Sequence, residues 1–201
     1  MLAGLVHCLA GLDGVHAADD VAGNATLEAS RTNKISATGE ADVGRPVQVD
    51  LDELPIPVLE MRDAILVAVE SGDLEDLRTA IEWNELRPEF GVSKDDDPIE
   101  VWRKQSEDGT GGEVLKLLGK LLEGGPASLP IGRDHENNAV YVWPYLSEVP
   151  VKNLNAADRE ALSAMMSEAE LEDLLEHGKW TWYRLAIGAD GTWHVFSRTE
   201  E

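Results

Sequence analysis

Residues 180–198 carry the pattern of a β-hairpin. Apolar and aromatic residues alternate with other types on both sides of Asp190-Gly191, a dipeptide that favours a tight turn. A two-residue turn there pairs Leu185 with Phe196 and assigns every other residue of the segment to one face of a sheet. Helices and sheets bury their apolar faces against one another, so this hairpin constrains how the rest of the chain is arranged.

The register of the predicted hairpin separates its side chains into two faces. The face expected to lie on the core carries Tyr183, Leu185, Ile187, His194 and Phe196. The opposite face carries Trp180, Trp182, Arg184, Ala186, Trp193 and Val195. This second face is aromatic with a single cation, and it places Trp193 over Gly188, where an aromatic ring can cover the glycine.

Helix start and stop signals recur upstream of the hairpin. Residues 58–70 are apolar on most of a helical surface, which predicts a well-buried helix. Asp73 and Asp97 each stand where an N-cap residue begins a further helix, and Pro98 suits the first helical position. Residues 113–123 carry an apolar stripe at helical spacing that a Gly-Gly-Pro sequence ends.

Strand and helix signals mix between these helices and the hairpin. Residues 128–143 predict two strands around a polar tip. Asn155 and Ser167 are predicted N-cap residues of two more helices, the second with a capping-box pattern. The predicted fold is α+β, with about six helices packed on one side of a small antiparallel sheet that ends in a C-terminal β-hairpin. Residues 54–201 are predicted to form this single domain.

The first 53 residues are predicted to precede that domain. Residues 1–12 form an apolar stretch of the length found in secretory signal peptides, and Val15-His16-Ala17 places small residues where a signal peptidase cleaves. The alternative interpretation is a short buried or frayed helix. Residues 18–53 are rich in small and polar residues, which predicts a flexible linker. We therefore expect residues 1–17 to be an export signal and the protein to be periplasmic or secreted.

A strong negative charge narrows the classes of partner. The chain has 39 acidic and 17 basic residues, for a formal net charge of −22. Neutralising phosphates takes Lys and Arg, so we expect no binding of nucleic acid or anionic lipid. No apolar run reaches the roughly 18 residues of a membrane-spanning helix, so we expect no integral membrane segment. The single cysteine, Cys8, excludes an internal disulfide framework and a Cys-rich zinc site.

Three groups of residues in the C-terminal half stand out as a set. They are Asp108-Gly109 with Gly112-Glu113 before a Leu-rich helix, Tyr141-Val142-Trp143-Pro144-Tyr145, and Tyr183-Arg184-Leu185 with Asp190-Gly191-Thr192-Trp193. As a set they resemble a family of uncharacterised, predicted exported bacterial proteins, over residues 58–197. The resemblance implies export and a single domain. It supplies no catalytic residues, because the family has no assigned activity.

The aromatic residues of the C-terminal half, together with one arginine, form the first candidate site. The candidate ligand-binding residues are Tyr141, Trp143, Tyr145, Trp180, Trp182, Arg184 and Trp193. Tryptophan is costly to expose, so these side chains either form a flat platform for a sugar ring or a peptide, or fill the core. Core packing is the more frequent of the two. Arg184 could hold a carboxylate or stack on Trp182 as a structural cation.

Two other groups have simpler interpretations. Asp134-His135-Glu136 offers metal-ligand residue types, but adjacent residues point in different directions, and we predict no metal site. The glycine-rich loop at 109–112 lacks the spacing and the lysine of a phosphate-binding loop. We therefore predict no cofactor.

The favoured function is that of an exported, non-catalytic domain that binds a polysaccharide or protein of the cell envelope. One alternative is a small hydrolase of the same compartment that pairs a buried carboxylate with a histidine, drawn from Glu113, Glu148, Asp190, His135 and His194. Another is a structural domain without a ligand. A binding domain predicts partly exposed Trp182 and Trp193, whereas a hydrolase predicts a pocket where a carboxylate and a histidine converge.

Overall fold

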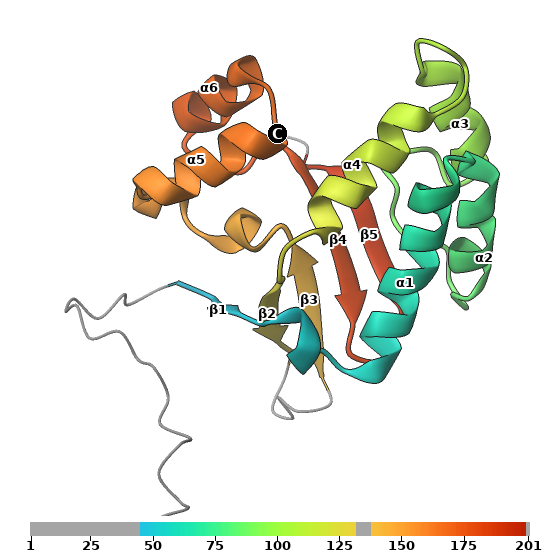
Figure 1. Cartoon of the computed structure of the whole chain (residues 1–201), viewed down its shortest axis with the longest axis horizontal. Coiled ribbons are helices and arrows are strands. Elements are labelled where there is room, and N and C mark those ends of the chain that lie inside the picture. The colour runs from blue at the N-terminus through green and yellow to red at the C-terminus, as the bar shows by residue number, and fades with distance from the viewer. Residues whose placement is uncertain (1–44, 132–137, 200–201) are drawn as a thin grey trace, which may run out of the picture. The chain divides into compact units, whose positions relative to one another are not determined.

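Five antiparallel strands form one sheet in the order β1-β2-β3-β4-β5, so neighbours in the sheet are also consecutive in the sequence (Figure 1). This computed structural model describes residues 45–131 and 138–199. The strands are β1 (Val47–Gln48), β2 (Ala127–Pro130), β3 (Ala139–Trp143), β4 (Tyr183–Gly188) and β5 (Trp193–Arg198). Strands β4 and β5 are the predicted C-terminal hairpin.

Six α-helices occur within the described residues and complete the predicted α+β fold. They are α1 (Ile56–Ser71), α2 (Leu77–Glu82), α3 (Pro98–Gln105), α4 (Gly112–Leu122), α5 (Ala156–Met165) and α6 (Glu168–His177). In Figure 1, α4 lies between α1, α2 and α3 on one side and the α5–α6 pair on the other. Helix α1 packs against both α4 and β4, which places the helical layer on one face of the sheet.

All four predicted N-cap residues make the expected contacts. Asp73 accepts a hydrogen bond from the backbone N–H two residues on, at 3.0 Å. Asp97 Oδ1 accepts a hydrogen bond from the backbone N–H two residues on, at 3.0 Å, and begins α3. Asn155 and Asp158 form both bonds of a capping box at the start of α5, and Ser167 and Glu170 do the same for α6. Because a capping box depends on residues three apart, these helix starts follow from the local sequence.

The core lies between the helices and one face of the sheet. Its fully buried side chains include Ile65 of α1, Leu118 and Leu122 of α4, and Leu185 and Ile187 of β4. The other face of the sheet carries a shallow hollow bordered by aliphatic side chains, including Leu129, Val140, Val142, Ala186 and Val195. The sheet therefore has one face in the core and one that the described helices do not cover.

The hairpin register agrees with the prediction away from the turn and differs beside it. Leu185 pairs with Phe196 as predicted, but Ile187 pairs with Trp193, because His194 is an extra residue in β5. Such a bulge shifts the adjoining side chains by one position. Trp193 is consequently fully buried and His194 is exposed. The predictions that Trp193 lies on the outer face and His194 on the core face are therefore wrong.

The turn of this hairpin has three residues rather than two. The Gly188 N–H donates a hydrogen bond to the Thr192 carbonyl at 2.8 Å, so the loop that this pair closes consists of residues 189–191. The Gly191 N–H donates to the Gly188 carbonyl at 2.8 Å. Gly191 has a φ of 85°, which suits the last residue of a three-residue hairpin loop. The His194 ring, and not Trp193, lies against Gly188, since a Cβ on that glycine would be 2.8 Å from His194 Nε2.

The folded unit begins before the predicted boundary at residue 54. Strand β1 pairs with β2, with Val47 opposite Ser128. Arg45 donates hydrogen bonds of 3.0 Å to both carboxylate oxygens of Asp158 on α5. The last nine residues of the predicted linker thus belong to the sheet and its surroundings. Strand pairing and a bidentate ion pair hold these nine residues in the fold. Their low apolar content therefore predicted a linker, although they are part of the folded unit.

Several predictions concern residues outside the described ranges. These are the export signal at 1–17, the linker up to residue 44, and the Asp134-His135-Glu136 group with the tip of the predicted 128–143 hairpin. They stay predictions. Within the described residues, no helix has the length and apolar character required to cross a membrane.

Candidate functional site

The three tryptophans at the centre of the predicted aromatic surface are part of the core. Trp143 and Trp193 are fully buried, and Trp182 is 3% exposed. The indole N–H of Trp143 donates to the Gly124 carbonyl at 2.8 Å, and that of Trp193 donates to the Val195 carbonyl at 3.0 Å. The indole N–H of Trp182 donates to a Glu170 carboxylate oxygen at 3.0 Å. Each indole N–H therefore has a partner inside the protein. Of the two alternatives for these three tryptophans, a ligand platform or core packing, the structure has core packing.

The remaining residues of that predicted set lie in separate places. Tyr141 is buried in the core, where burial raises the pKa of its hydroxyl. Tyr145 is half-buried beneath the Arg45 guanidinium, 5.8 Å from its ring centroid. Trp180 is half-buried and donates to the Tyr183 carbonyl at 3.3 Å. Arg184 is exposed and borders the hollow on the uncovered sheet face. The structure does not assemble these seven side chains into one surface.

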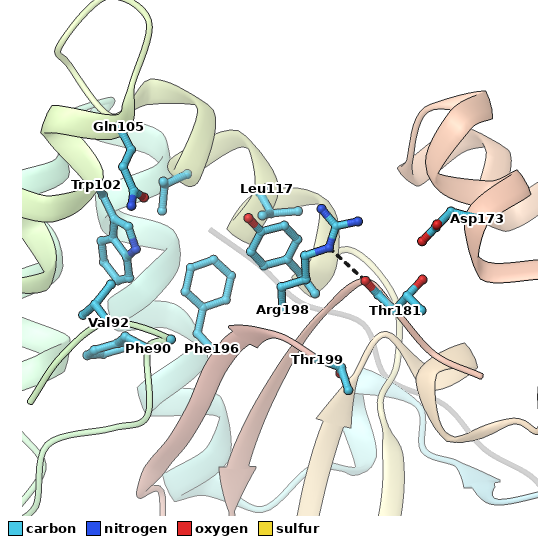
Figure 2. Close-up of a pocket in the computed structure, with 13 residues that line it drawn as sticks. Phe90, Val92, Trp102, Gln105, Leu117, Asp173, Thr181, Phe196, Arg198 and Thr199 are labelled. Carbon is cyan, nitrogen blue, oxygen red and sulfur yellow. Dashed lines mark hydrogen bonds between the residues drawn. The ribbon is translucent and has the colours of Figure 1, made fainter. Parts of the chain in front are cut away.

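A different hollow gathers aromatic side chains on the helical side of the molecule. It is a cavity of about 470 Å³ bordered by residues from α3, α4, α6, the ends of β4 and β5, and the segment that follows α2. Its ring-bearing residues are Phe90, Trp102, Tyr183 and Phe196, and Val92, Val114 and Leu117 add aliphatic surface. Figure 2 shows Phe90, Trp102 and Phe196 on one side of the hollow and Arg198 with Thr181 on the other. We call this hollow the aromatic pocket.

The rings of the aromatic pocket support one another. Trp102 meets Phe90 edge-on at a centroid distance of 5.1 Å and Phe196 edge-on at 5.7 Å. Tyr183 stacks on Phe196 at 5.9 Å with an interplanar angle of 27°. Edge-on and stacked pairs of this kind add stability beyond the area they bury. The wall of the pocket is therefore a preformed aromatic surface.

Arg198 lies at the opposite side of the aromatic pocket. Its Nε donates to the Thr181 backbone carbonyl at 2.9 Å, which orients the guanidinium (Figure 2). The side chain is exposed, and among the described residues no carboxylate lies within 4.0 Å of it. Asp173, the acidic residue that borders the pocket, lies 3.3 Å from the ring of His177. Arg198 thus presents two terminal nitrogen atoms to the pocket.

Three polar groups of the aromatic pocket have no hydrogen-bond partner within the described part of the chain. Two are the buried hydroxyl oxygens of Thr181 and Thr199. The third is the indole N–H of Trp102, a side chain that is 6% exposed. The Trp102 N–H is not itself a buried atom, so solvent or a ligand reaches it. Buried polar groups are nearly always hydrogen-bonded, so the two threonine hydroxyls are exceptions, and they indicate a place where a ligand supplies partners.

Of the described residues considered for hydrolysis, one carboxylate and one histidine border the same hollow. Glu148 and His194 both border the hollow on the uncovered sheet face, where aliphatic side chains dominate. Asp190 accepts hydrogen bonds from Thr192, and these hold the pKa of its carboxyl below the ordinary value despite partial burial. A general acid needs a raised pKa, so Asp190 is unsuited to that role. Within residues 45–131 and 138–199, no group of His, Cys, Asp and Glu is arranged to hold a metal ion.

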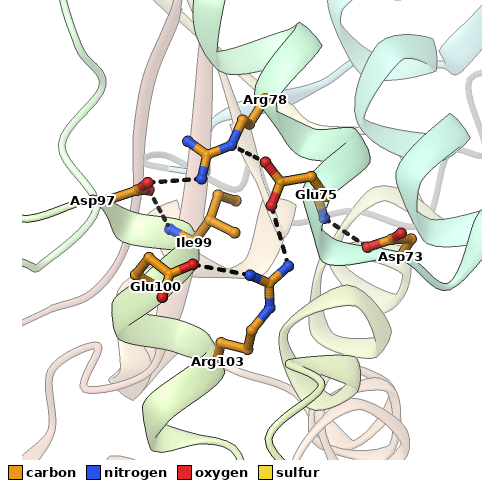
Figure 3. Close-up of polar contacts among 7 residues, drawn as sticks. All are labelled: Asp73, Glu75, Arg78, Asp97, Ile99, Glu100 and Arg103. Atoms are coloured by element: carbon orange, nitrogen blue, oxygen red, sulfur yellow. Dashed lines mark hydrogen bonds and ion pairs between the residues drawn. The ribbon is translucent and has the colours of Figure 1, made fainter.

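An ion-pair cluster on the surface between α2 and α3 is a further concentration of charge (Figure 3). Glu75 binds both Arg78 and Arg103, and the two arginines also bind Asp97 and Glu100, respectively. Hydrogen bonds from both arginines lower the pKa of the Glu75 carboxyl. Because each guanidinium contacts two carboxylates, the cluster joins the two helices and leaves little charge for a ligand.

No family model, curated protein or solved structure matches this chain. The resemblance to exported bacterial proteins therefore stays a prediction, and the arrangement of side chains carries the functional argument.

Sequence reasoning missed the residues that build the aromatic pocket. Phe90 lies in an irregular segment, Trp102 on a short helix, and Thr181, Arg198 and Thr199 at the ends of strands. These residues lie up to 109 positions apart in the chain and share no spacing that marks a site. One weak signal was available: Arg198 is the one Lys or Arg residue of β5.

Proposed function

We propose that this protein is a non-catalytic binding domain whose site is the aromatic pocket. Its ligand places an apolar group against the aromatic wall and a carboxylate against Arg198. The observation that carries the proposal is the set of polar groups without partners around this hollow: the Thr181 and Thr199 hydroxyls and the Trp102 indole N–H. All three can donate a hydrogen bond, as the guanidinium does, so the pocket favours a ligand head with several acceptor oxygens.

Charge supports an anionic ligand at this position. The protein as a whole carries a net charge of −22, which repels anions, so an anion needs a local cation to bind. Arg198 supplies that cation, and its planar fork matches a carboxylate in two parallel hydrogen bonds.

The proposal includes export. The apolar stretch at 1–12 and the small residues at 15 and 17 support cleavage after Ala17 and a site of action in the envelope or outside the cell. Protein recovered from cells that express the full chain should begin at Ala18 when its N-terminus is sequenced. An intact Met1 in the mature protein would contradict export by this route.

Calorimetric titration with 3-phenylpropionate tests the binding site, with 3-phenylpropan-1-ol as the uncharged probe of the same shape. The carboxylate should bind and the alcohol should bind at least about tenfold more weakly, because a hydrogen bond to a charged group is worth roughly 1.5–3 kcal/mol. Arg198→Gln should remove this preference. Arg184→Gln is the matched control, since Arg184 is also an exposed arginine of the hairpin but borders the other sheet face.

Two results would contradict this function. One is equal binding of the acid and the alcohol, which would remove Arg198 from the site. The other is an equal loss of binding in the Arg184→Gln and Arg198→Gln variants, which would mean that net charge and not the pocket governs the interaction.

A further inference from the structure

Two side chains of opposite charge border the aromatic pocket, and they do not pair with each other. Arg198 ends β5 and Asp173 lies on α6, and among the described residues they are the charged side chains of this hollow. No nitrogen atom of Arg198 lies within 4.0 Å of the Asp173 carboxylate. A guanidinium and a carboxylate that border one hollow without contact leave room for a group that bridges them.

The aromatic pocket has an apolar side and a charged side. Figure 2 shows Asp173 on the same side of the hollow as Arg198 and Thr181, away from Phe90 and Trp102. The charges therefore gather at one end of the hollow, and the rings gather at the other. A ligand that matches this arrangement has its charged groups close together and a ring directed away from them.

The Asp173 carboxylate is able to accept a hydrogen bond from a ligand. His177 Nδ1 lies 2.8 Å from the Asp173 backbone carbonyl and 3.3 Å from Asp173 Oδ1. Both neighbours of Nδ1 are acceptors, so Nδ1 carries the proton and makes its shorter contact with the carbonyl. The carboxylate is 44% exposed, and no hydrogen bond to its Oδ2 occurs within the described part of the chain.

The charge of the hollow favours a ligand that carries both signs. A simple anion is attracted by Arg198 and repelled by Asp173, within a protein whose net charge is −22. An ammonium group on the same ligand replaces that repulsion with an ion pair. The charges of Arg198 and Asp173 sum to zero, as do those of a zwitterion.

The buried hydroxyl of Thr181 suits the same head group. It has no partner within the described residues. A hydroxyl donates one hydrogen bond and also accepts, so it can donate to a ligand carboxylate and accept from a neighbouring ammonium. A neutral sugar could use this hydroxyl, but it would leave both Arg198 and Asp173 without a charged partner.

The dimensions of the hollow suit a single small molecule. Its volume is about 470 Å³, within the range of about 300–1,000 Å³ that is usual for small-molecule sites. An α-amino acid carries its carboxylate and its ammonium on one carbon atom and directs its side chain away from both. An aromatic amino acid therefore has the same separation of charge and ring as the aromatic pocket.

We propose that the ligand of the aromatic pocket is a free α-amino acid with an aromatic side chain. Its ring packs on the wall formed by Phe90, Trp102 and Phe196, its carboxylate binds Arg198, and its ammonium binds Asp173. This inference rests on the proposed function and specifies the ligand of the same site.

Calorimetric titration of the full chain with L-phenylalanine and three related molecules tests the inference. 3-Phenylpropionate lacks the ammonium, 2-phenylethylamine lacks the carboxylate, and N-acetyl-L-phenylalanine keeps every part except the charge on nitrogen. L-Phenylalanine should bind at least tenfold more tightly than each of the three, because each omits one charged hydrogen bond.

Replacement of Asp173 locates the ammonium site. Asp173→Asn should abolish the advantage of L-phenylalanine over 3-phenylpropionate without weakening the binding of 3-phenylpropionate. Glu176→Gln is the matched control, since it removes one negative charge from an exposed residue of the same helix that does not border the hollow. This control should keep the affinity for L-phenylalanine within twofold. Circular dichroism verifies that both variants fold, and the comparison with N-acetyl-L-phenylalanine tests the ammonium without any substitution.

The outcomes separate this inference from the function on which it rests. If none of the four molecules binds, the proposed function is wrong. If 3-phenylpropionate binds and L-phenylalanine binds no more tightly, the proposed function stands and the amino-acid assignment is overturned. An equal loss of L-phenylalanine binding in the Asp173→Asn and Glu176→Gln variants would also overturn it, because net charge and not Asp173 would then control the affinity.

Discussion

The buried tryptophans of this protein fall into two groups that differ in the contacts of their indole N–H groups. Trp143, Trp182 and Trp193 each donate to an acceptor of the protein. Trp102 lies at the aromatic pocket, and its N–H has no acceptor among the described residues. Both groups are buried by area, yet only the second leaves a donor available.

This difference shows that burial alone does not distinguish a structural aromatic residue from a binding one. An indole whose N–H is bonded inside the protein contributes to folding and offers nothing specific to a ligand. The buried hydroxyls of Thr181 and Thr199 lower stability unless a ligand completes their contacts, and the Trp102 N–H beside them is available to the same ligand. The first group should therefore control stability, and the second should control binding.

Replacement of Trp193 should have the largest effect on stability. Trp193→Ala removes a fully buried ring that packs on Phe90 and Phe196, and it should lower the free energy of unfolding by about 3–5 kcal/mol. Urea unfolding followed by circular dichroism measures this change. Trp83→Ala is the control, because Trp83 is 58% exposed and its loss should cost less than about 0.5 kcal/mol. Equal losses in the two variants would invalidate the division between buried and accessible tryptophans.

Removal of a pocket hydroxyl should act in the opposite direction. Thr181→Val keeps the shape of a side chain that is 8% exposed and deletes a hydroxyl without a partner, so it should raise the free energy of unfolding by about 1 kcal/mol. The same substitution should weaken the binding of 3-phenylpropionate. A loss of stability of that size would instead mean that the hydroxyl is already satisfied, and Thr181 would then belong with the structural group.

The contact between Glu170 and Trp182 should give a small, pH-dependent effect. Burial raises the pKa of the Glu170 carboxyl, but hydrogen bonds from Ser167 and Trp182 outweigh burial and leave the pKa below its ordinary value of 4.5. The ionised carboxylate therefore stabilises the folded state above about pH 4.5, and this contribution is lost as the pH falls through the folded-state pKa.

Comparison of the protein with its Glu170→Gln variant measures that contribution. The variant should be less stable by about 0.3–1 kcal/mol at pH 7, the usual value for a carboxylate in the first turn of a helix. The difference should shrink as the pH is lowered from 4.5 towards 2 in urea unfolding at constant ionic strength. A difference that grows in acid would mean that Glu170 is stabilising in its protonated form.

Much of the secondary structure could be predicted because its signals are local. The caps at Asp97, Asn155 and Ser167 and the turn around Asp190-Gly191 depend on residues a few positions apart. The pairing of the hairpin strands away from the turn, such as Leu185 with Phe196, could be predicted for the same reason. The order of strands in the sheet and the entry of residues 45–53 into the fold could not be predicted, since both depend on pairing between distant segments.

The candidate site could not be predicted for a related reason. The predicted set was chosen because aromatic residues cluster in the sequence near the hairpin, and the bulge at His194 then turned Trp193 into the core. The aromatic pocket instead joins Phe90 and Trp102 to Thr181 and Arg198. These residues meet because α3, α4 and the sheet pack together, and no pattern along the chain encodes that meeting.

The amino-acid sequence by itself determined the α+β class, the starts of the helices and the presence of the C-terminal hairpin, because capping, helical periodicity and strand alternation act over a few residues. The tertiary structure decided which face each hairpin side chain takes, since one extra residue in β5 reverses the alternation beside it. It also decided which polar groups are left without partners. Whether a hydroxyl or an indole N–H is satisfied depends on every segment that packs around it.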